Sequence, residues 1–180
     1  GFICIKNTSK YRNKLANAAR KVMAVSRLNI ALCGDDAEAM SETLRLCSDR
    51  RPLLICGNDA PAGDFIKLAH EYKVPLAVSV ASLEEAVAVT DAAKKSGVDE
   101  IVINIKAKGT ARRIQDFAYA RRTALKKNFR PLGYPLMAFT ESADSDLELA
   151  EAVSYVAKYA SLVVVKNFDK EFMLPLLVAR

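Results

Sequence analysis

Residues Arg51 to Ala81, RPLLICGNDAPAGDFIKLAHEYKVPLAVSVA, decide the fold. An apolar run from Pro52 to Cys56 breaks at Gly57, a helical segment then runs to Tyr72, and a second apolar run covers Pro75 to Val80. Both runs are apolar at successive positions, which is typical of strands that are buried on both faces. A helix between two such strands makes them parallel neighbours. The stretch therefore predicts a strand–helix–strand unit of a parallel sheet.

The rest of the chain repeats this unit. We expect strands at residues 2–6, 28–33, 52–56, 75–80, 101–105, 136–140 and 162–165, each followed by a helix. A pace of about 25 residues per unit is close to that of the (β/α) barrel, which has eight units in about 250 residues. The predicted fold class is therefore α/β, a TIM-barrel-like parallel sheet with seven strand–helix units. Seven units do not close such a barrel, so we expect a partial or fragment barrel, with an open doubly wound sheet as the alternative.

Polar residues at the turns predict where several helices begin. We expect helix N-caps from Asn7-Thr8-Ser9, from Asp35-Asp36, from Ser82 and from Asp144. No linker or low-complexity segment divides the chain, so we expect one domain over residues 1–180. Because neither end looks like a tail, we also expect the chain to be a piece of something larger, or to take its missing strand from a partner or another segment.

The composition favours an ordinary globular protein, at 51% hydrophobic and 27% charged residues. No apolar run approaches the twenty or so residues that span a bilayer, so we expect no membrane association and a cytoplasmic location. The net charge of +6 comes from 27 basic and 21 acidic residues. The basic excess lies at Lys10, Arg12, Lys14, Arg20, Lys21 and Arg27, and again at Arg112, Arg113, Arg121, Arg122, Lys126, Lys127 and Arg130.

Basic helices of this kind can mark a nucleic-acid surface, but no binding motif or interleaved aromatic residues accompany them. We expect a solvated outer face, or a surface for an acidic protein or an anionic ligand, and no nucleic-acid partner. The four cysteines, Cys4, Cys33, Cys47 and Cys56, form no CxxC pair, and His70 gives no zinc-type spacing. We therefore expect neither disulfides nor a metal site.

The carboxyl ends of the strands supply the candidate site residues, because ligands of parallel α/β folds bind there. LCGDDA at 32–37 is echoed by ICGNDA at 55–60, at equivalent turns one unit apart. Shared turn chemistry and ligand binding both explain the repeat. The candidate ligand-binding residues are Cys33, Asp35, Cys56, Asn58, Ser79, Asn104 and Thr140. The candidate catalytic residues are Lys6, Lys106 and Lys166, since a desolvated lysine at a strand end could form a Schiff base as in aldolases.

Four segments carry a resemblance to a known family. They are RPLL at 51–54, VPLAVS at 74–79, RRTAL at 121–125 and RPLGYP at 130–135. They resemble the central barrel domain of the large (gamma) subunit of the corrinoid iron–sulfur protein of the acetyl-CoA synthase and acetyl-CoA decarbonylase/synthase systems. The resemblance runs from about Leu28 to the end of the chain. The family tends to have Asp-Pro-Gly where this chain has Asn104-Ile105-Lys106, a departure that argues against a pterin-like pocket.

The resemblance implies methyl transfer in one-carbon metabolism, with a corrinoid that takes a methyl group from a tetrahydropterin donor and passes it to acetyl-CoA synthase. It places the iron–sulfur cluster and the corrinoid in other domains of the parent protein, so we expect no cofactor on this chain. The expected function is a non-catalytic scaffold that docks a partner barrel subunit, the corrinoid domain or a methyltransferase. The alternative is an independent aldolase-like enzyme that uses a strand-end lysine.

Overall fold

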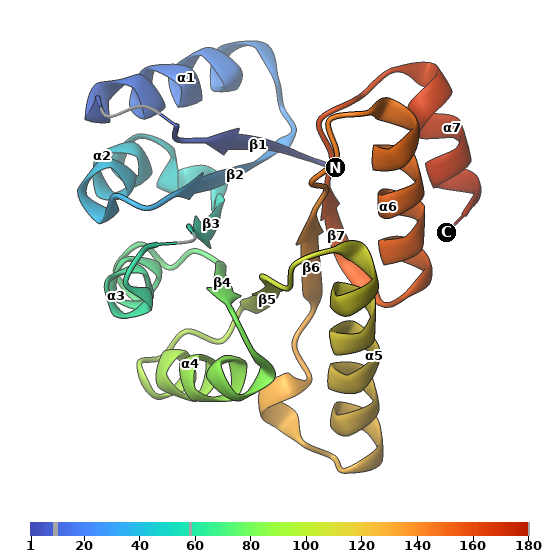
Figure 1. The fold of residues 1–180 in the computed structure, drawn as a ribbon. Helices are drawn as coiled ribbons and strands as arrows, with labels where there is room; N and C mark the ends of the chain where they lie inside the picture. Colours follow the sequence, from blue (N-terminus) through green and yellow to red (C-terminus); the bar gives the residue numbers. More distant parts are fainter. Residues whose placement is uncertain (9–10, 58, 180) are drawn as a thin grey trace. The chain divides into compact units, whose positions relative to one another are not determined.

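Strands and helices alternate along the whole chain in the computed structural model, which describes residues 1–8, 11–57 and 59–179 (Figure 1). The strands are β1 (Phe2–Lys6), β2 (Asn29–Gly34), β3 (Leu53–Cys56), β4 (Leu76–Val80), β5 (Ile101–Ile105), β6 (Leu136–Phe139) and β7 (Ala160–Val164). The helices that follow them are α1 (Arg12–Val25), α2 (Ala37–Cys47), α3 (Ala62–Tyr72), α4 (Leu83–Lys95), α5 (Thr110–Lys126), α6 (Ser145–Ala157) and α7 (Lys170–Val178). Two single-turn 3₁₀ helices, η1 (Ser48–Arg50) and η2 (Arg130–Leu132), follow α2 and α5. The predicted α/β class with seven strand–helix units is confirmed.

The chain divides into two compact units. The first comprises Gly1–Ser79 and Ala88–Val102, and the second comprises Val80–Val87 and Ile103–Arg180. Both are built from the same strand–helix repeat, and the prediction of one domain over residues 1–180 stays a prediction.

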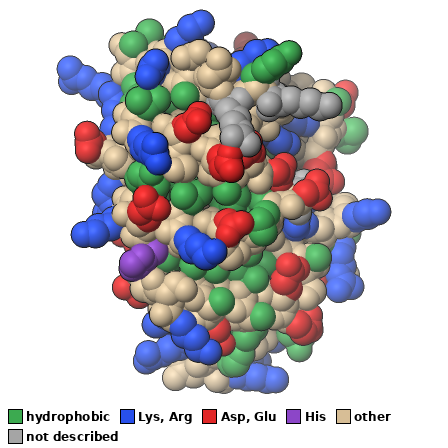
Figure 2. Space-filling model, turned by 90° about the vertical axis from the view of Figure 1, so that its left-hand side faces the viewer, with side chains coloured by type: hydrophobic (Ala, Val, Ile, Leu, Met, Phe, Trp, Pro, Cys, Tyr) green, Lys and Arg blue, Asp and Glu red, His purple; other side chains and the backbone are tan. Residues whose placement is uncertain are grey.

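The first unit is a parallel sheet with helices packed along it. Strands β1, β2, β3 and β4 pair in chain order, with Cys4 opposite Ala31 and Cys33 opposite Ile55. Helices α1, α2 and α3 lie side by side along the sheet (Figure 1). Their apolar faces and the strands bury a core that includes Leu15, Ile30, Leu32, Met40, Leu44, Leu54, Ile55 and Phe65. On the face that Figure 2 presents, basic and acidic side chains are both exposed.

The second unit repeats the arrangement with β5, β6 and β7. Ile103 pairs with Leu136 and Met137 with Leu162, all in parallel. The rings of Phe117 on α5 and Tyr155 on α6 meet edge to face at 6.2 Å and are fully buried. They form the core of this unit together with Ile103, Ile105, Met137, Ala138 and Ala152.

Polar side-chain caps explain where several helices begin. Asp36 and Asp144 cap α2 and α6 as predicted, each accepting two backbone N–H groups of the first turn. Ser82 accepts the N–H of Glu85 at the start of α4, which confirms the third cap. Helix α1 begins at Arg12 after Tyr11, which makes no side-chain cap, whereas the expected Ser9 lies outside the described residues.

Two strands of the second unit begin or end away from the predicted residues. Strand β7 begins at Ala160 because Tyr159, with φ of 76°, turns the chain two residues earlier than predicted. A register shift between Leu136 and Met137 accommodates the extra residue in β7. Strand β6 ends at Phe139, one residue before the predicted Thr140. Among the described residues, no helix combines the length and the apolar character that crossing a bilayer requires.

Candidate functional site

In the first unit, the ends of β2 and β3 are tied together by the repeated turns. The N–H of Gly57 donates to the carbonyl of Gly34 at 2.8 Å, so both glycines lie at one edge of the sheet, as predicted. The Asp35 carboxylate accepts the N–H of Asp59 at 2.9 Å, across from one turn to the next. A Cβ on Gly57 would lie 2.7 Å from the carbonyl carbon of Gly34 and would meet the Asp35 carboxylate. Gly57 is therefore required by close approach, and Asp35 serves the turn itself.

The two cysteines of this edge do not meet. Cys33 lies opposite Ile55 and Cys56 lies opposite Gly34, so the two thiols are one register step apart. Successive side chains of a strand point to opposite faces, which places Cys33 and Cys56 on different faces of the sheet. Burial, with the nearby Cys4 thiol adding to it, raises the pKa of Cys33 to about 12. A protonated thiol is a poor ligand and nucleophile.

No set of three or more His, Cys, Asp or Glu side chains is placed to hold a metal ion within the described parts of the chain. All four cysteines are free thiols. His70 is exposed on α3, and its ring lies beside Gly97, which has φ of 83°. These residues do not fit an iron–sulfur cluster, which needs thiolates that converge on one point.

The other candidate ligand residues are placed separately. The Ser79 hydroxyl is buried and donates to the carbonyl of Cys56 at 2.6 Å. Asn104 is 6% exposed within β5. Asn58 lies outside the described residues. The structure thus brings Ser79 next to Cys56, and Asp35 joins the turn after β2 to the turn after β3. The assignment of these residues to a ligand site stays a prediction.

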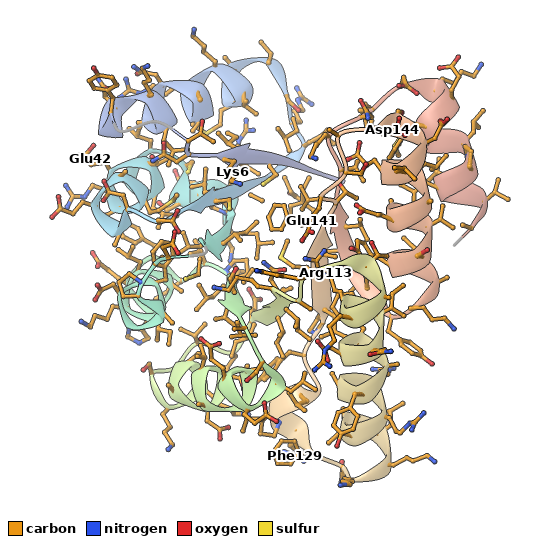
Figure 3. The ribbon with its side chains drawn as sticks, in the orientation of Figure 1. Lys6, Glu42, Arg113, Phe129, Glu141 and Asp144 are labelled. Atoms are coloured by element: carbon orange, nitrogen blue, oxygen red, sulfur yellow. The ribbon has the colours of Figure 1, made fainter. Side chains whose placement is uncertain are left out.

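The second unit holds a buried cation, Arg113, at the ends of β5 and β6. Its side chain is only 6% exposed, and Figure 3 shows it pointing toward Glu141, with which it forms an ion pair. The guanidinium donates five hydrogen bonds, to the carbonyls of Ile105, Ala107 and Phe139, the hydroxyl of Tyr155 and the carboxylate of Glu141. It also lies 5.4 Å from the centre of the Tyr155 ring. Arg113 therefore fixes the backbone that leaves β5 and β6 onto α5 and α6.

A buried carboxylate, Glu148 of α6, holds the backbone that follows β7. Its oxygens accept the Thr140 hydroxyl at 2.5 Å, the Lys166 N–H at 2.6 Å and the Asn167 side-chain amide at 2.7 Å. Burial opposes ionisation of Glu148, but these hydrogen bonds outweigh it and hold its pKa below the ordinary value. The structure thus brings Thr140 and Lys166 together, around an acid that the sequence analysis did not single out.

The candidate lysines lie in three different settings. Lys6 is exposed at the end of β1, and Lys106 is half-buried after β5. The Lys166 ammonium donates to the carbonyls of Glu141 and Ser142 at 3.0 and 2.6 Å. These two contacts tie the Lys166 amine to the backbone of the loop after β6, whereas a Schiff-base lysine must reach a substrate carbonyl.

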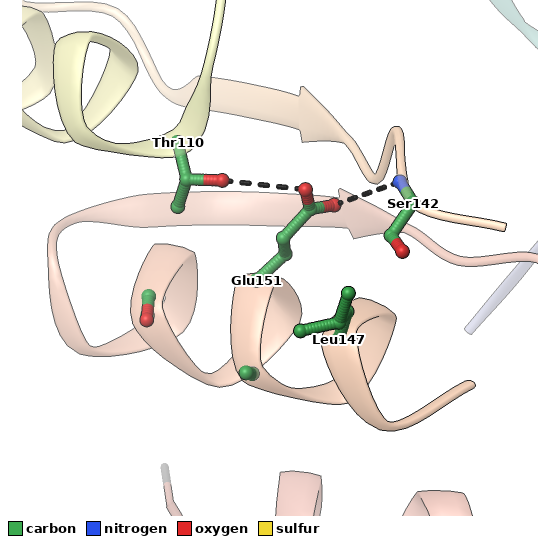
Figure 4. A pocket seen from close by; sticks show the side chains of 6 residues that line it. Thr110, Ser142, Leu147 and Glu151 are labelled. Atoms are coloured by element: carbon green, nitrogen blue, oxygen red, sulfur yellow. Dashed lines mark hydrogen bonds between the residues drawn. The ribbon is translucent and has the colours of Figure 1, made fainter. Parts of the chain in front are cut away.

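A shallow pocket of about 330 Å³ lies on the outside of this network, between the start of α5 and α6. Glu151 forms its polar wall and accepts the N–H of Ser142 and the hydroxyl of Thr110, both at 3.3 Å (Figure 4). Glu151 also accepts the N–H of Glu141 at 2.8 Å. The carboxylate is therefore occupied by the loop after β6, and the rest of the lining comes from Leu147, Ala150 and Ser154.

Comparison with known proteins identifies the family. A sequence model described as "CO dehydrogenase/acetyl-CoA synthase delta subunit" matches residues 1–180. The chain belongs to the CO dehydrogenase/acetyl-CoA synthase delta subunit family. This agrees with the resemblance to the corrinoid iron–sulfur protein stated from the sequence.

Curated relatives of this family member are subunits of larger proteins. The chain is 41% identical over 160 residues to the corrinoid/iron-sulfur protein large subunit of Moorella thermoacetica, covering 89% of this chain and 36% of that protein. It is 26% identical over 196 aligned residues to the acetyl-CoA decarbonylase/synthase complex subunit gamma of Archaeoglobus fulgidus, covering 100% of this chain and 41% of that protein. The chain therefore spans about two-fifths or less of the length of the curated relatives it matches.

Solved structures support the fold alone. The chain superposes on the 7,8-dihydropteroate synthase of Vibrio fischeri with a TM-score of 0.72 at 16% identity, covering 99% of this chain and 77% of that one. The dihydropteroate synthase of Yersinia pestis gives 0.71 at 12% identity, with 99% and 80% covered. The TIM-barrel-like fold class predicted from the sequence is confirmed.

Two residues that organise this family member's strand ends were missed or misread from the sequence. Arg113 was grouped with a solvated basic face and is instead buried, which is a correction to that prediction. Its position gives the signal, because Arg113, Phe117 and Ala120 share the buried face of α5 at spacings of four and three. Glu148 likewise shares the buried face of α6 with Ala152 and Tyr155. A charged residue at an inward periodic position is the sign that was overlooked.

Proposed function

We propose that this chain is the barrel of a corrinoid iron–sulfur methyl-carrier protein and acts there as a scaffold. It holds a partner barrel subunit, the corrinoid domain or a methyltransferase in place while a methyl group passes from a methyl-tetrahydropterin donor to acetyl-CoA synthase. The chain itself does no chemistry. It works in the cytoplasm, and another segment or a partner supplies the eighth strand.

One observation carries the scaffold part of this proposal. The charged side chains at the strand ends of the second unit form hydrogen bonds with the backbone of the loops around them. Arg113, Glu148 and Glu151 each bind backbone groups of the segments that leave the strands. Catalytic groups at such an edge would instead face a ligand. Residues that immobilise their own loops favour a rigid support for another molecule.

The names of the relatives support the assignment to a methyl-carrier system. One relative is named a corrinoid/iron-sulfur protein large subunit, and others are named gamma subunits of an acetyl-CoA decarbonylase/synthase complex. Because the chain spans 36% of the first relative, the corrinoid and the cluster are assigned to the remaining parts of the parent protein. The chain's own cysteines do not suit a cluster, since Cys33 and Cys56 lie on opposite faces of the sheet and burial raises the pKa of Cys4 and Cys47 to about 11.

A binding experiment tests the scaffold proposal. The tagged chain is mixed with the purified partner barrel subunit, the corrinoid domain and the methyltransferase of the same system, and each mixture is analysed by sedimentation velocity. We expect a complex with at least one of them, and no cobalamin-type absorbance on the chain alone after mixing with free corrinoid. If the chain forms a complex with none of the three, the scaffold proposal is refuted.

Borohydride trapping with a panel of small aldehydes and ketones distinguishes the alternative, an aldolase-like enzyme, from the scaffold. A stable adduct on Lys6, Lys106 or Lys166 supports the enzyme, and no adduct supports the scaffold. The two carbonyl contacts of the Lys166 ammonium favour the second outcome for that residue.

A further inference from the structure

The second half of α5 and the turn behind it expose an unusual group of side chains, which we call the α5 patch: Tyr119, Arg122, Leu125, Lys126 and Phe129. Residues three and four apart are neighbours on a helix surface. The steps from 119 to 122 and from 122 to 126 are three and four, so these positions share one side of α5. Tyr119 is 58% exposed, Leu125 66% and Phe129 37%. Figure 3 shows Phe129 at the far end of α5 from Arg113.

The α5 patch is distinct from the face that α5 turns to its own core. Arg113, Phe117 and Ala120 are buried, and they hold the helix onto α6 and the strand ends. Beyond the helix, Asn128 adopts φ of 50° and Leu132 is buried in η2. The turn is therefore anchored, which presents Phe129 beside the last helical turn.

Along the chain, the charged residues of the α5 patch and its sequence neighbours have one sign. Residues 117–130 include five basic side chains, Arg121, Arg122, Lys126, Lys127 and Arg130, and no Asp or Glu. Residues 1–34 likewise contain no Asp or Glu, so the basic surface of α1 is a second face of one charge sign and serves as the comparison in the test below. A helix whose basic residues only kept it in solution would gain stability from acids three or four residues away. Their absence over these fourteen residues leaves a field that attracts an acidic surface.

The exposed apolar side chains decide what kind of acidic surface fits. Tyrosine, phenylalanine and arginine are enriched at the centres of protein interfaces, where apolar contact excludes water and charges set orientation. Nucleic acid would engage the basic residues through phosphates, but Leu125 has no counterpart on a sugar–phosphate backbone. The combination of Leu125 and Tyr119 with Arg122 and Lys126 therefore suits an apolar spot ringed by carboxylates.

We propose that the α5 patch is the docking surface for an acidic face of a partner subunit of the same methyl-transfer system. This inference rests on the proposed scaffold function and adds the surface through which the scaffold holds its partner. Arg122 and Lys126 meet carboxylates of the partner, and Tyr119, Leu125 and Phe129 meet its apolar spot.

Charge reversal with a matched control tests the assignment. The wild-type chain, Arg122→Glu/Lys126→Glu, and the control Arg20→Glu/Lys21→Glu on α1 are compared by biolayer interferometry against the purified partner barrel subunit and methyltransferase. Both variants change the net charge equally, at residues that are exposed. We expect the α5 variant to weaken the Kd of the bound partner about thirtyfold, since like charges then face each other. The α1 control should stay within about twofold of wild type.

An apolar pair and a milder variant complete the test. Leu125→Ala should weaken binding about fivefold, whereas Val25→Ala, at an 87% exposed position of α1, should not. If the glutamate variant loses its helical circular dichroism signal and is therefore unfolded, the milder Arg122→Gln/Lys126→Gln variant repeats the charge test.

The outcomes are distinguishable. If the wild-type chain binds none of the partner barrel subunit, the methyltransferase and the corrinoid domain, the scaffold proposal fails, and this inference fails with it. If it binds only the corrinoid domain, the scaffold stands and this inference alone is wrong. If wild type binds and the α5 variants bind equally well, only the assignment of the α5 patch is wrong. Binding of a 20-base-pair DNA duplex more tightly than either protein, lost in the α5 variant, would show that the patch serves nucleic acid and would also overturn the inference.

Discussion

Replacing the buried Glu148 by glutamine tests the network at the β7 end most directly. The carboxylate accepts the Thr140 hydroxyl and the Lys166 N–H on one oxygen, and the Asn167 backbone and side-chain amides on the other. Glutamine has nearly the same shape but only one accepting oxygen, so one pair of donors then faces an NH₂ group. A hydrogen bond to a charged group contributes about 1.5–3 kcal/mol, and a buried donor left unpaired costs about 1–3 kcal/mol. We expect Glu148→Gln to lower the free energy of unfolding by about 3 kcal/mol.

Two measurements check this expectation. Urea unfolding gives the change in stability, and hydrogen exchange of the Lys166 and Asn167 amides reports the loop itself, which should open more often in the variant. Glu42→Gln is the matched control, because Glu42 is exposed on α2 and surface changes stay within about 0.5 kcal/mol. A variant as stable as wild type, with unchanged exchange at Lys166, would refute the role assigned to Glu148.

The same carboxylate sets a pH dependence. The pKa of folded Glu148 lies below the ordinary value, since its hydrogen bonds outweigh the cost of burial. Its contribution is therefore complete above the unfolded-state value of about 4.3 and is lost as the pH falls through the lower folded-state value. The difference in the free energy of unfolding between wild type and Glu148→Gln should shrink over that acidic range and stay constant near neutral pH, between about pH 6 and 8. A difference that persists undiminished at the acid end would contradict this account.

Three further predictions concern other parts of the fold. Arg113→Ala removes all five hydrogen bonds of a buried cation and should cost about 3–5 kcal/mol in urea unfolding, whereas Arg112→Ala, with a 69% exposed side chain, should be nearly neutral. Gly57→Ala should destabilise by about 1–3 kcal/mol, because the new Cβ meets the backbone of Gly34, while Gly63→Ala in open space on α3 should stabilise by about 0.5–1 kcal/mol. The thiol of Cys33 should react with DTNB at pH 8 only after unfolding, since burial raises its pKa to about 12; fast labelling in the native state would show that the β2 end is open.

The fold was largely predictable because burial leaves a simple pattern. Strands buried on both faces, such as Leu53–Cys56 and Ile101–Ile105, read as continuous apolar runs. Aspartates at the turns read as caps, as Asp36 and Asp144 show. The start of β7 was missed by two residues, because a left-handed turn at a non-glycine residue, Tyr159, has no sequence sign.

The candidate site was less predictable, because strand ends can be identified but side-chain partners cannot. Thr140 and Lys166 were selected for their places at strand ends, and both contact Glu148. Cys33 and Cys56 were selected by the same reasoning, yet a one-residue difference in register puts them on opposite faces. Buried partners follow helical periodicity, so a search for charged residues at inward positions would have found Arg113.

The network at the strand ends and the exposed face of α5 are two consequences of one helix. Arg113, in the first turn of α5, holds the backbone at the ends of β5 and β6 by hydrogen bonds. The second half of α5 lies away from these strand ends. Association costs free energy whenever mobile segments must be ordered on contact, so a support whose loops are already held binds at a lower entropic cost. A helix anchored by Arg113 and Phe117 presents Tyr119 and Arg122 at fixed positions. On the docking proposal made above, Arg113→Lys, which keeps the charge but not the planar fork, should weaken partner binding in the interferometry assay even though Arg113 itself is buried.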